Sequence, residues 1–288
     1  MAGPPARLGS EVERTEGVFE VPALEVNVSY AMFLVVFLLL PILALGWAVH
    51  IRVRRGELSP TLFRRGMQGA LALATIALIY TTPWDNVLVA RGIWGYAPQR
   101  VLGLTIGWVP LEEYLFFVLQ PLLIGLWSLW IWQDEREIDR DGRAFRAGSA
   151  MFLVGAGLAI LSLAHRLGDP GAYLVAIGMW GWPPLLVQTL FGADILYASR
   201  RALLLRWVPP ALFLSAADRL AIHAGIWFLN PAFTTGWTVL GLPMEEGLFF
   251  FLTSLLVAGG WTLWMHPAAE RRLSPWWKSP RLMERRNP

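Results

Sequence analysis

The sequence PLEEYLFF at residues 110–117 returns 133 residues later as PMEEGLFF at residues 243–250. Each copy sets two adjacent glutamates at the start of a long apolar segment. Further pairs keep the same offset without a gap: Asp85 and Asp218, Gly92-Ile93-Trp94 and Gly225-Ile226-Trp227, Pro98 and Pro231, Gly103 and Gly236, Thr105 and Thr238. Ionisable groups in membrane segments are costly and commonly functional. The duplicated acids therefore predict one site built from two halves.

The composition favours a membrane protein. Hydrophobic residues make up 56% of the 288 residues and charged residues 16%, which is too little charge to cover a soluble surface. Seven apolar stretches span, or nearly span, a bilayer, which takes roughly 17–25 helical residues. They cover residues 30–51, 67–83, 109–132, 147–164, 171–190, 206–223 and 243–266. The predicted fold class is an all-α integral membrane protein with seven transmembrane helices.

The basic residues indicate how the chain is oriented. The net charge is +3, but Lys and Arg gather in alternate loops, which is the positive-inside pattern and no indication of a nucleic-acid partner. The arginines of these loops are Arg52, Arg54, Arg55, Arg64 and Arg65, then Arg136, Arg140, Arg143 and Arg146, then Arg200, Arg201 and Arg206. We therefore expect the amino terminus outside the cell, the carboxyl terminus in the cytoplasm, and the lipid bilayer as a partner.

The offset divides the chain into two equivalent parts. Residues 30–132 form the first three-helix repeat, residues 133–170 a linker with helix four, and residues 171–266 the second three-helix repeat. Residues 1–29 are predicted to be a disordered extracytoplasmic tail. Residues 267–288 are predicted to be a basic cytoplasmic tail, held at the interface by Trp276, Trp277 and Lys278. An odd number of helices separates the copies, so the repeats are parallel and related by a pseudo-two-fold axis along the membrane normal.

This 3+1+3 arrangement predicts a ring of acids near the outer face. Both glutamate pairs, Glu112/Glu113 and Glu245/Glu246, begin helices at similar depth, and Asp85 and Asp218 lie near the outer ends of the preceding helices. A single copy would more commonly be an ordinary helix start, because proline and acids favour the first turn. Two copies in register favour catalysis. Neighbouring helical residues diverge by about 100°, so one glutamate of each pair should face the central space; the sequence leaves open which.

The side chains around the acids allow two interpretations. Phe116, Phe117, Phe249 and Phe250 are typical of core or lipid-facing packing, but beside buried acids their ring faces can stabilise a cation. Trp94, Trp227, Asn86 and Arg219 join the candidate substrate-binding or cation-stabilising set through their repeat positions, and Arg219 can neutralise one acid. An apolar surrounding favours protonated carboxyls and a helix start favours ionised ones, so a mixture suited to proton donation and return is expected.

Other chemistries lack their motifs. The chain has no cysteine, no His-x-x-x-His spacing, no dinucleotide-binding glycine pattern and no aspartate-rich diphosphate-binding run. We therefore expect no metal, no cofactor and no phosphorylated prenyl substrate.

Residues 82–86 (TPWDN), 92–94 (GIW), 110–117 and 243–246 (PMEE) resemble the signatures of the membrane-integral lycopene cyclase family. Its members occur as small paired subunits in some bacteria and as fused domains in archaea and fungi, and this chain resembles the fused form. The resemblance implies cyclisation of the linear ends of lycopene, or a related linear carotenoid, to β-ionone rings without net redox, giving γ- and β-carotene. It leaves open an association with other carotenoid enzymes. Gly247 replaces Tyr114, so the two halves need not contribute equally.

The sequence leaves three alternatives open. A proton-coupled small-molecule transporter of 3+1+3 topology would also place acids around a centre, although its mid-membrane positions should be more polar. A cyclase of C50 carotenoids or a carotenoid hydratase would share the acid machinery.

Overall fold

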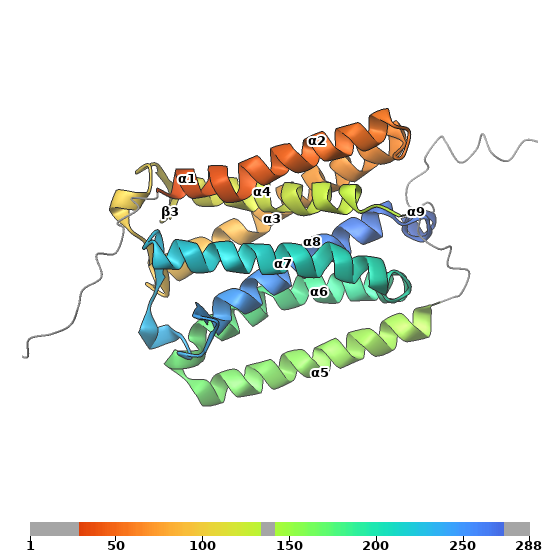
Figure 1. Cartoon of the computed structure of the whole chain (residues 1–288). Coiled ribbons are helices and arrows are strands. Elements are labelled where there is room, and N and C mark those ends of the chain that lie inside the picture. The colour runs from red at the N-terminus through yellow and green to blue at the C-terminus, as the bar shows by residue number, and fades with distance from the viewer. Residues whose placement is uncertain (1–28, 134–141, 274–288) are drawn as a thin grey trace, which may run out of the picture.

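The computed structural model describes residues 29–133 and 142–273. Most of the predicted amino-terminal tail, Arg136 and Arg140 of the linker, and the segment with Trp276, Trp277 and Lys278 lie outside these residues. The described chain is a bundle of long helices that run along a common direction (Figure 1). The helices are α1 Tyr30–Leu34, continued through a π-helical turn η1 Val35–Leu39 into α2 Leu40–Arg54, then α3 Pro60–Ala90, α4 Leu111–Trp130, α5 Arg143–Leu167, α6 Ala172–Ala198, α7 Arg200–His223, α8 Met244–Met265 and α9 Pro267–Leu273.

Each of the seven apolar stretches predicted from the sequence overlaps one of these helices. Six helical segments of the described chain are long and apolar enough to cross a membrane: Tyr30–Arg54, Pro60–Ala90, Leu111–Trp130, Arg143–Ser162, Asp169–Ala198 and Met244–Met265. Helix α7 is as long as these, but it carries Arg200, Arg201, Arg206, Asp218 and Arg219, which make it more polar. The spans are therefore shown for six helices.

Helix α3 is longer than the predicted stretch at residues 67–83. Ser59 caps its start, because its side-chain oxygen accepts a 3.1 Å hydrogen bond from the Leu62 amide. The helix continues to Ala90, so Asp85, expected near the end of the helix, lies within its last turns and is fully buried. Polar residues therefore extend the helix beyond the hydrophobic stretch that identifies it.

Helices α3 and α7 end in the same way. Gly92 and Gly225 follow them with φ of 65° each, a left-handed conformation that favours glycine. In both copies the next two amides close the helix: Gly92 and Ile93 donate to Val89 and Leu88, and their equivalents 133 residues later repeat this bonding. Because both helices end in this way, the segments that follow them run across the end of the bundle.

The segments that follow α3 and α7 are built from the same short elements. The first contains β1 Trp94–Tyr96, η2 Pro98–Arg100, β2 Thr105–Ile106 and β3 Val109–Pro110. The second contains β4 Trp227–Leu229, η4 Pro231–Phe233, β5 Thr238–Val239 and β6 Leu242–Pro243, while η3 Asp169–Gly171 joins α5 to α6. In each copy the two short strands nearest the glutamate pair form a hairpin, β2 with β3 and β5 with β6.

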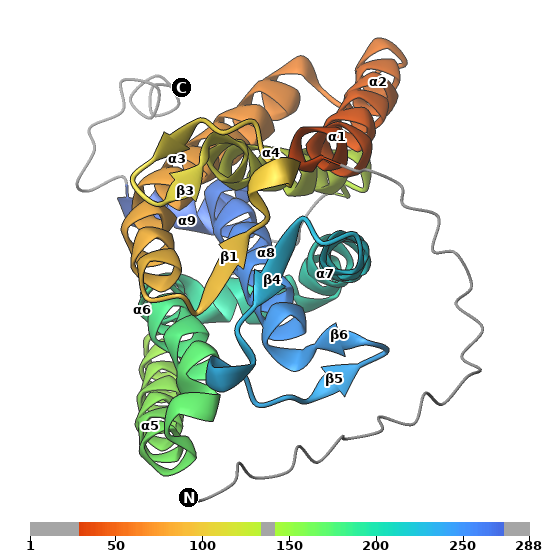
Figure 2. The same ribbon diagram turned by 90° about the vertical axis from the view of Figure 1, so that its left-hand side faces the viewer.

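Strands β1 and β4 pair antiparallel and form a two-stranded ribbon, which joins the two repeats across one end of the bundle (Figure 2). Gly95 lies opposite Phe228, its equivalent at the 133-residue offset, and Tyr96 lies opposite Trp227. A strand pair centred on two equivalent residues requires a two-fold relationship between the strands. The ribbon therefore carries the pseudo-two-fold axis that the repeat predicts, and α4 and α8 begin at the same end of the bundle.

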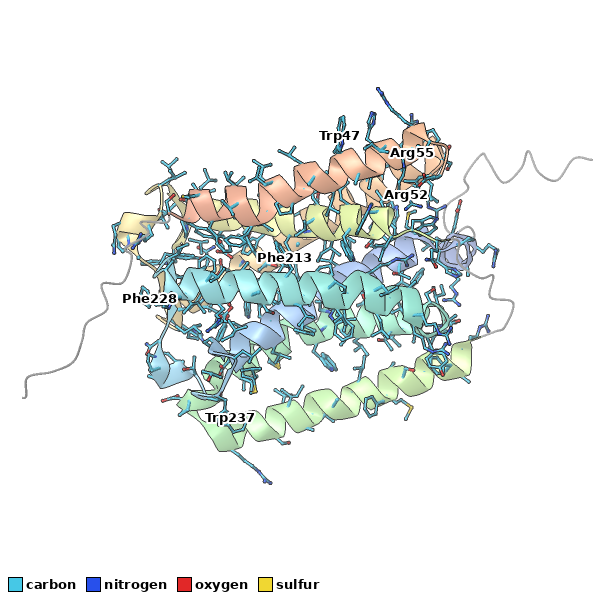
Figure 3. The ribbon with its side chains drawn as sticks, in the orientation of Figure 1. Trp47, Arg52, Arg55, Phe213, Phe228 and Trp237 are labelled. Atoms are coloured by element: carbon cyan, nitrogen blue, oxygen red, sulfur yellow. The ribbon has the colours of Figure 1, made fainter. Side chains whose placement is uncertain are left out.

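Helices α4 and α8 form the centre of the bundle. In the apolar window of each, 67% of the residues are buried, against 22% in the first helix, α3 and α6, and 6% in α5. The outer helices expose apolar side chains such as Trp47 and Phe213 (Figure 3). Figure 3 also places Arg52 and Arg55 at the end of the bundle opposite to Phe228 and Trp237. The first turns of the two central helices, with their glutamates, are therefore surrounded by protein.

Candidate active site

The structure separates the two glutamates of each pair. Glu112 turns towards its own preceding loop, where its Oε1 accepts a 2.6 Å hydrogen bond from the Leu102 amide. Glu245 does the same in the second repeat, accepting from the Thr235 amide at 2.6 Å and from the Thr235 hydroxyl at 2.8 Å. Leu102 and Thr235 are equivalent at the 133-residue offset. The first glutamate of each pair thus ties down a loop.

The second glutamate of each pair, Glu113 and Glu246, lines a cavity between the repeats. Side chains from α1, α3, α4, α6, α7 and α8 and from both strands of the ribbon surround it. The lining residues are Tyr30, Trp84, Asp85, Trp94, Glu113, Phe116, Phe117, Tyr173, Asp218, Trp227, Glu246, Phe249 and Phe250. Four carboxyl groups, two from each repeat, therefore face one space whose other walls are aromatic.

Each cavity glutamate accepts a hydrogen bond from a buried tyrosine. Tyr30 Oη lies 2.5 Å from Glu113 Oε2, and Tyr173 Oη lies 2.7 Å from Glu246 Oε1. The tyrosines begin equivalent helices, but they are 143 residues apart, so they fall outside the gapless repeat and the sequence did not identify them. The signal that could have found them is the tyrosine at the start of the first helix of each repeat.

The two aspartates are buried to the same degree but bonded differently. Asp218 Oδ1 accepts a 2.9 Å hydrogen bond from the Trp227 indole N–H. Neither oxygen of Asp85 has a hydrogen-bond partner among the described residues, and within residues 29–133 and 142–273 the Trp94 indole N–H is unpaired as well. Asp85 is 0% exposed and Asp218 is 1% exposed, so this difference lies inside the protein.

Aromatic rings form the rest of the wall. Trp84 stacks on Phe249 with ring centres 6.0 Å apart and an angle of 7° between the planes. Phe116 and Phe250 meet edge to face across the repeats at 5.9 Å. Such rings present electron-rich faces, which attract a positive charge. The lining is therefore suited to contact an apolar group and to stabilise a cation that forms on it.

Tyr96 stands behind this wall, in the ribbon and outside the helices. Its ring stacks near Tyr30, with centres 6.1 Å apart. Burial, with the nearby Glu113 and Asp85 carboxyls, raises the pKa of the Tyr96 hydroxyl well above its usual range. The phenol therefore stays protonated. Leu229 takes its place in the second repeat, so the phenol is found in one half only.

Besides Glu112 and Glu245, two residues predicted from the repeat do not line the cavity. Asn86 holds the β2–β3 hairpin, where its Oδ1 accepts from the Trp108 amide at 2.8 Å and its Nδ2 donates to Tyr114 at 2.9 Å. Arg219, at the equivalent position, is exposed and packs beside Gly241 of the other hairpin. Both therefore contact the hairpins rather than the acids.

The described residues contain no group of three or more His, Asp or Glu side chains arranged to hold a metal ion. The arrangement instead offers proton donors and acceptors that face an apolar space.

Comparison with known proteins agrees with this chemistry. The sequence matches the family described as lycopene cyclase over residues 26–131 and 172–263, one segment in each repeat. A lycopene beta-cyclase of Halobacterium salinarum is 41% identical over 238 residues, which cover 82% of this chain and 95% of the relative. Bifunctional lycopene cyclase/phytoene synthases of Podospora anserina and Leptosphaeria maculans are 28% and 33% identical over 202 residues each, which cover 66% and 65% of this chain and 34% of each relative. No solved structure matches the chain.

Proposed function

Because the chain belongs to the lycopene cyclase family and is an enzyme that cyclises lycopene, we propose that it is a lycopene β-cyclase acting by acid–base catalysis in carotenoid biosynthesis. It would close the linear ends of lycopene to β-ionone rings and yield γ-carotene and then β-carotene. The single observation that carries the proposal is the cavity, in which carboxyls of both repeats meet an aromatic wall.

The reaction requires the enzyme to donate one proton to the substrate and to remove one proton from the ring cation. A carboxylic acid protonates the terminal alkene of lycopene, which becomes a tertiary carbocation. The π electrons of a nearby double bond attack this cation and close the ring, and a carboxylate then removes a proton from the ring cation. Substrate and product are isomers, so no oxidant or reductant is consumed. The candidate groups are the cavity carboxyls Glu113, Glu246, Asp85 and Asp218.

The aromatic lining suits the intermediate. Ring faces of Phe116, Phe250 and Trp84 can stabilise the cation. A polar wall would instead hold water, which would attack the cation. Exclusion of water also distinguishes cyclisation from hydration, because a water molecule in the cavity would give an alcohol. The lining therefore favours the cyclase over a carotenoid hydratase.

We further propose that α7 also spans the membrane, which completes seven spans in a 3+1+3 order. Its polar residues Arg206 and Asp218 are buried in the bundle, while Leu205 and Leu212 are exposed as lipid-facing side chains would be. The basic end of the bundle, with Arg52 and Arg55, would lie in the cytoplasm, and the ribbon and the cavity near the outer face. A C40 or larger polyene dissolves in the same bilayer and can reach the cavity from it.

Expression in lycopene-accumulating cells tests the function. We expect γ- and β-carotene in the pigment extract, and lycopene alone from the variant Glu113→Gln/Glu246→Gln at equal protein level in the membrane. Unchanged lycopene with inserted wild-type protein would refute the proposal. A transporter would instead move a solute into proteoliposomes without changing the pigment, and a C50 cyclase would leave lycopene intact but convert a C50 substrate.

A further inference from the structure

The repeat makes the two halves of the cavity comparable residue by residue, and one hydrogen bond breaks the equivalence. Asp85 and Asp218 are equivalent, as are Trp94 and Trp227, and in each half the tryptophan follows the aspartate by nine residues. Only the second pair is bonded, with 2.9 Å between Trp227 Nε1 and Asp218 Oδ1. The first pair is unbonded, and no other described residue pairs with Asp85.

The tyrosines and glutamates do not show this difference. Tyr30 donates to Glu113 as Tyr173 donates to Glu246, at 2.5 and 2.7 Å. The Tyr96 phenol near Glu113 and Asp85 is present in the first half only. Among the direct hydrogen bonds of the four cavity carboxyls, those of the aspartates differ between the halves.

A hydrogen-bond donor decides which state a buried carboxyl can hold. A carboxylate buried without a donor is costly, because nothing replaces the water it has lost, whereas a neutral carboxylic acid avoids that cost and carries a proton. A donor such as an indole N–H lowers the cost of the charge, since hydrogen bonds to ionised acceptors are among the stronger ones. Asp85 thus suits the role of acid, and Asp218 that of base.

We propose that the two halves of the cavity divide the reaction, with Asp85 giving the proton and Asp218, held by the Trp227 indole N–H, taking one back. This assignment rests on the proposed lycopene cyclase function and names the roles inside that site. Trp227 acts through Asp218 and is a positioning residue.

Protonation, ring closure and deprotonation follow one another in the cavity. The O–H bond of Asp85 breaks as its proton forms a C–H bond with the terminal alkene, which leaves a tertiary cation and the Asp85 carboxylate. The π electrons of the second double bond form the ring bond, and the positive charge moves to the other carbon of that double bond. Asp218 removes the proton from the newly bonded carbon, and that C–H pair becomes the ring double bond. The proton returns from Asp218 to Asp85 by way of Glu113 and Glu246 before the next turnover.

The base affects the structure of the product and the acid does not, so product analysis distinguishes the two groups. The ring cation has three neighbouring carbons that carry protons, and the place of the base decides which proton is lost. The acid acts before the ring exists and cannot change that choice. A substitution that shifts the carboxyl group of the base should therefore alter the position of the ring double bond. The same substitution of the acid should alter the rate alone.

The test is pigment analysis of Asp218→Glu and Asp85→Glu, expressed at matched membrane levels in lycopene-producing cells. We expect Asp218→Glu to yield ring isomers other than the β form, and Asp85→Glu to make the wild-type isomer more slowly. Trp227→Phe should reproduce the isomer change with about a tenfold lower rate, as expected for a lost hydrogen bond to a charged group. Trp94→Phe is the matched control, because its ring changes in the same way while no bond to Asp85 is lost, and we expect it to keep the isomer ratio.

If Asp85→Glu changes the isomer ratio and Asp218→Glu does not, the roles are reversed and the proposal is wrong. Unchanged ratios in all four variants would refute a division of roles. If an Asp→Glu variant does not accumulate, Asp218→Asn and Asp85→Asn answer the same question through their residual products. Failure of the wild type to cyclise lycopene would overturn the proposed function itself, which is a different outcome.

Discussion

Gln120 donates a 2.8 Å hydrogen bond to Thr253, the residue that occupies its own position in the second repeat. Equivalent residues touch only where a two-fold axis passes between them, so this buried contact places the axis between α4 and α8. The Gly95–Phe228 pair of the ribbon lies on the same axis at the end of the bundle. The cavity is therefore a single space that both repeats enclose.

A shared cavity predicts that the two glutamates that line it do not work independently. We expect Glu113→Gln and Glu246→Gln each to lower the initial rate by about 10²–10⁴-fold, as for groups in general acid–base catalysis. Combining them should add little, because groups that act as a unit are non-additive. The measurement is the initial rate in membranes at matched protein level. Two independent sites would instead leave each single variant near half of the wild-type rate.

The first glutamate of each pair should matter for stability more than for chemistry. Glu112→Gln keeps an oxygen that can accept the Leu102 N–H, so we expect a rate within about tenfold of wild type, far above that of Glu113→Gln. Glu112→Ala leaves this N–H without its acceptor, which costs about 1–3 kcal/mol. Thermal unfolding in detergent measures this loss. A rate for Glu112→Gln as low as that of Glu113→Gln would contradict the separation.

Removing the tyrosine hydroxyls should slow the reaction in both halves. Tyr30→Phe and Tyr173→Phe each delete one hydrogen bond to a cavity glutamate, and we expect about a tenfold fall in rate for each, the scale of a bond to a charged acceptor. Tyr80→Phe is the control, because the Tyr80 hydroxyl donates to the Trp180 carbonyl and does not face the cavity. Equal losses in all three variants would show a general packing effect instead.

The orientation can be tested by labelling. Single cysteines in this cysteine-free chain, at Gln99 beside the ribbon and at Arg55 at the opposite end, are both exposed. We expect an impermeant maleimide to label Gln99→Cys in intact cells and Arg55→Cys only after the cells are opened. The opposite pattern would put the cavity near the cytoplasmic face.

The sequence predicted the helices well because a bilayer sets their length and polarity. Each apolar stretch overlaps a helix, and the offset between Asp85 and Asp218 located the acids that the fold brings together. The sequence could not identify the ribbon, because strands such as β1 are too short for a periodic pattern. It also missed the true end of α3, where polar residues continue the helix.

Which of Glu112 and Glu113 faces the cavity depends on the conformation of the loop before α4, which the sequence does not predict. Both are buried, at 0% and 5% exposure, so hydrophobic patterning does not separate them. The difference arises because the loop before α4 folds back and offers the Leu102 amide to one of the two. The tyrosines were hidden for another reason. Tyr173 precedes Asp218 by 45 residues whereas Tyr30 precedes Asp85 by 55, so the second repeat is ten residues shorter there and Tyr173 falls outside the 133-residue register, although it does in its half what Tyr30 does in the other.

The ribbon suggests how such a protein could arise. Its register is self-complementary, since the strand from one repeat meets the other at the same residue of each, which is how two identical subunits pair in a symmetric dimer. A gene for one repeat could thus have encoded a working homodimer. Identical subunits must carry identical substitutions, so any mutation that improved one aspartate as an acid would have changed its twin as well. Duplication within one gene would remove that restraint, so that selection could act on each copy separately.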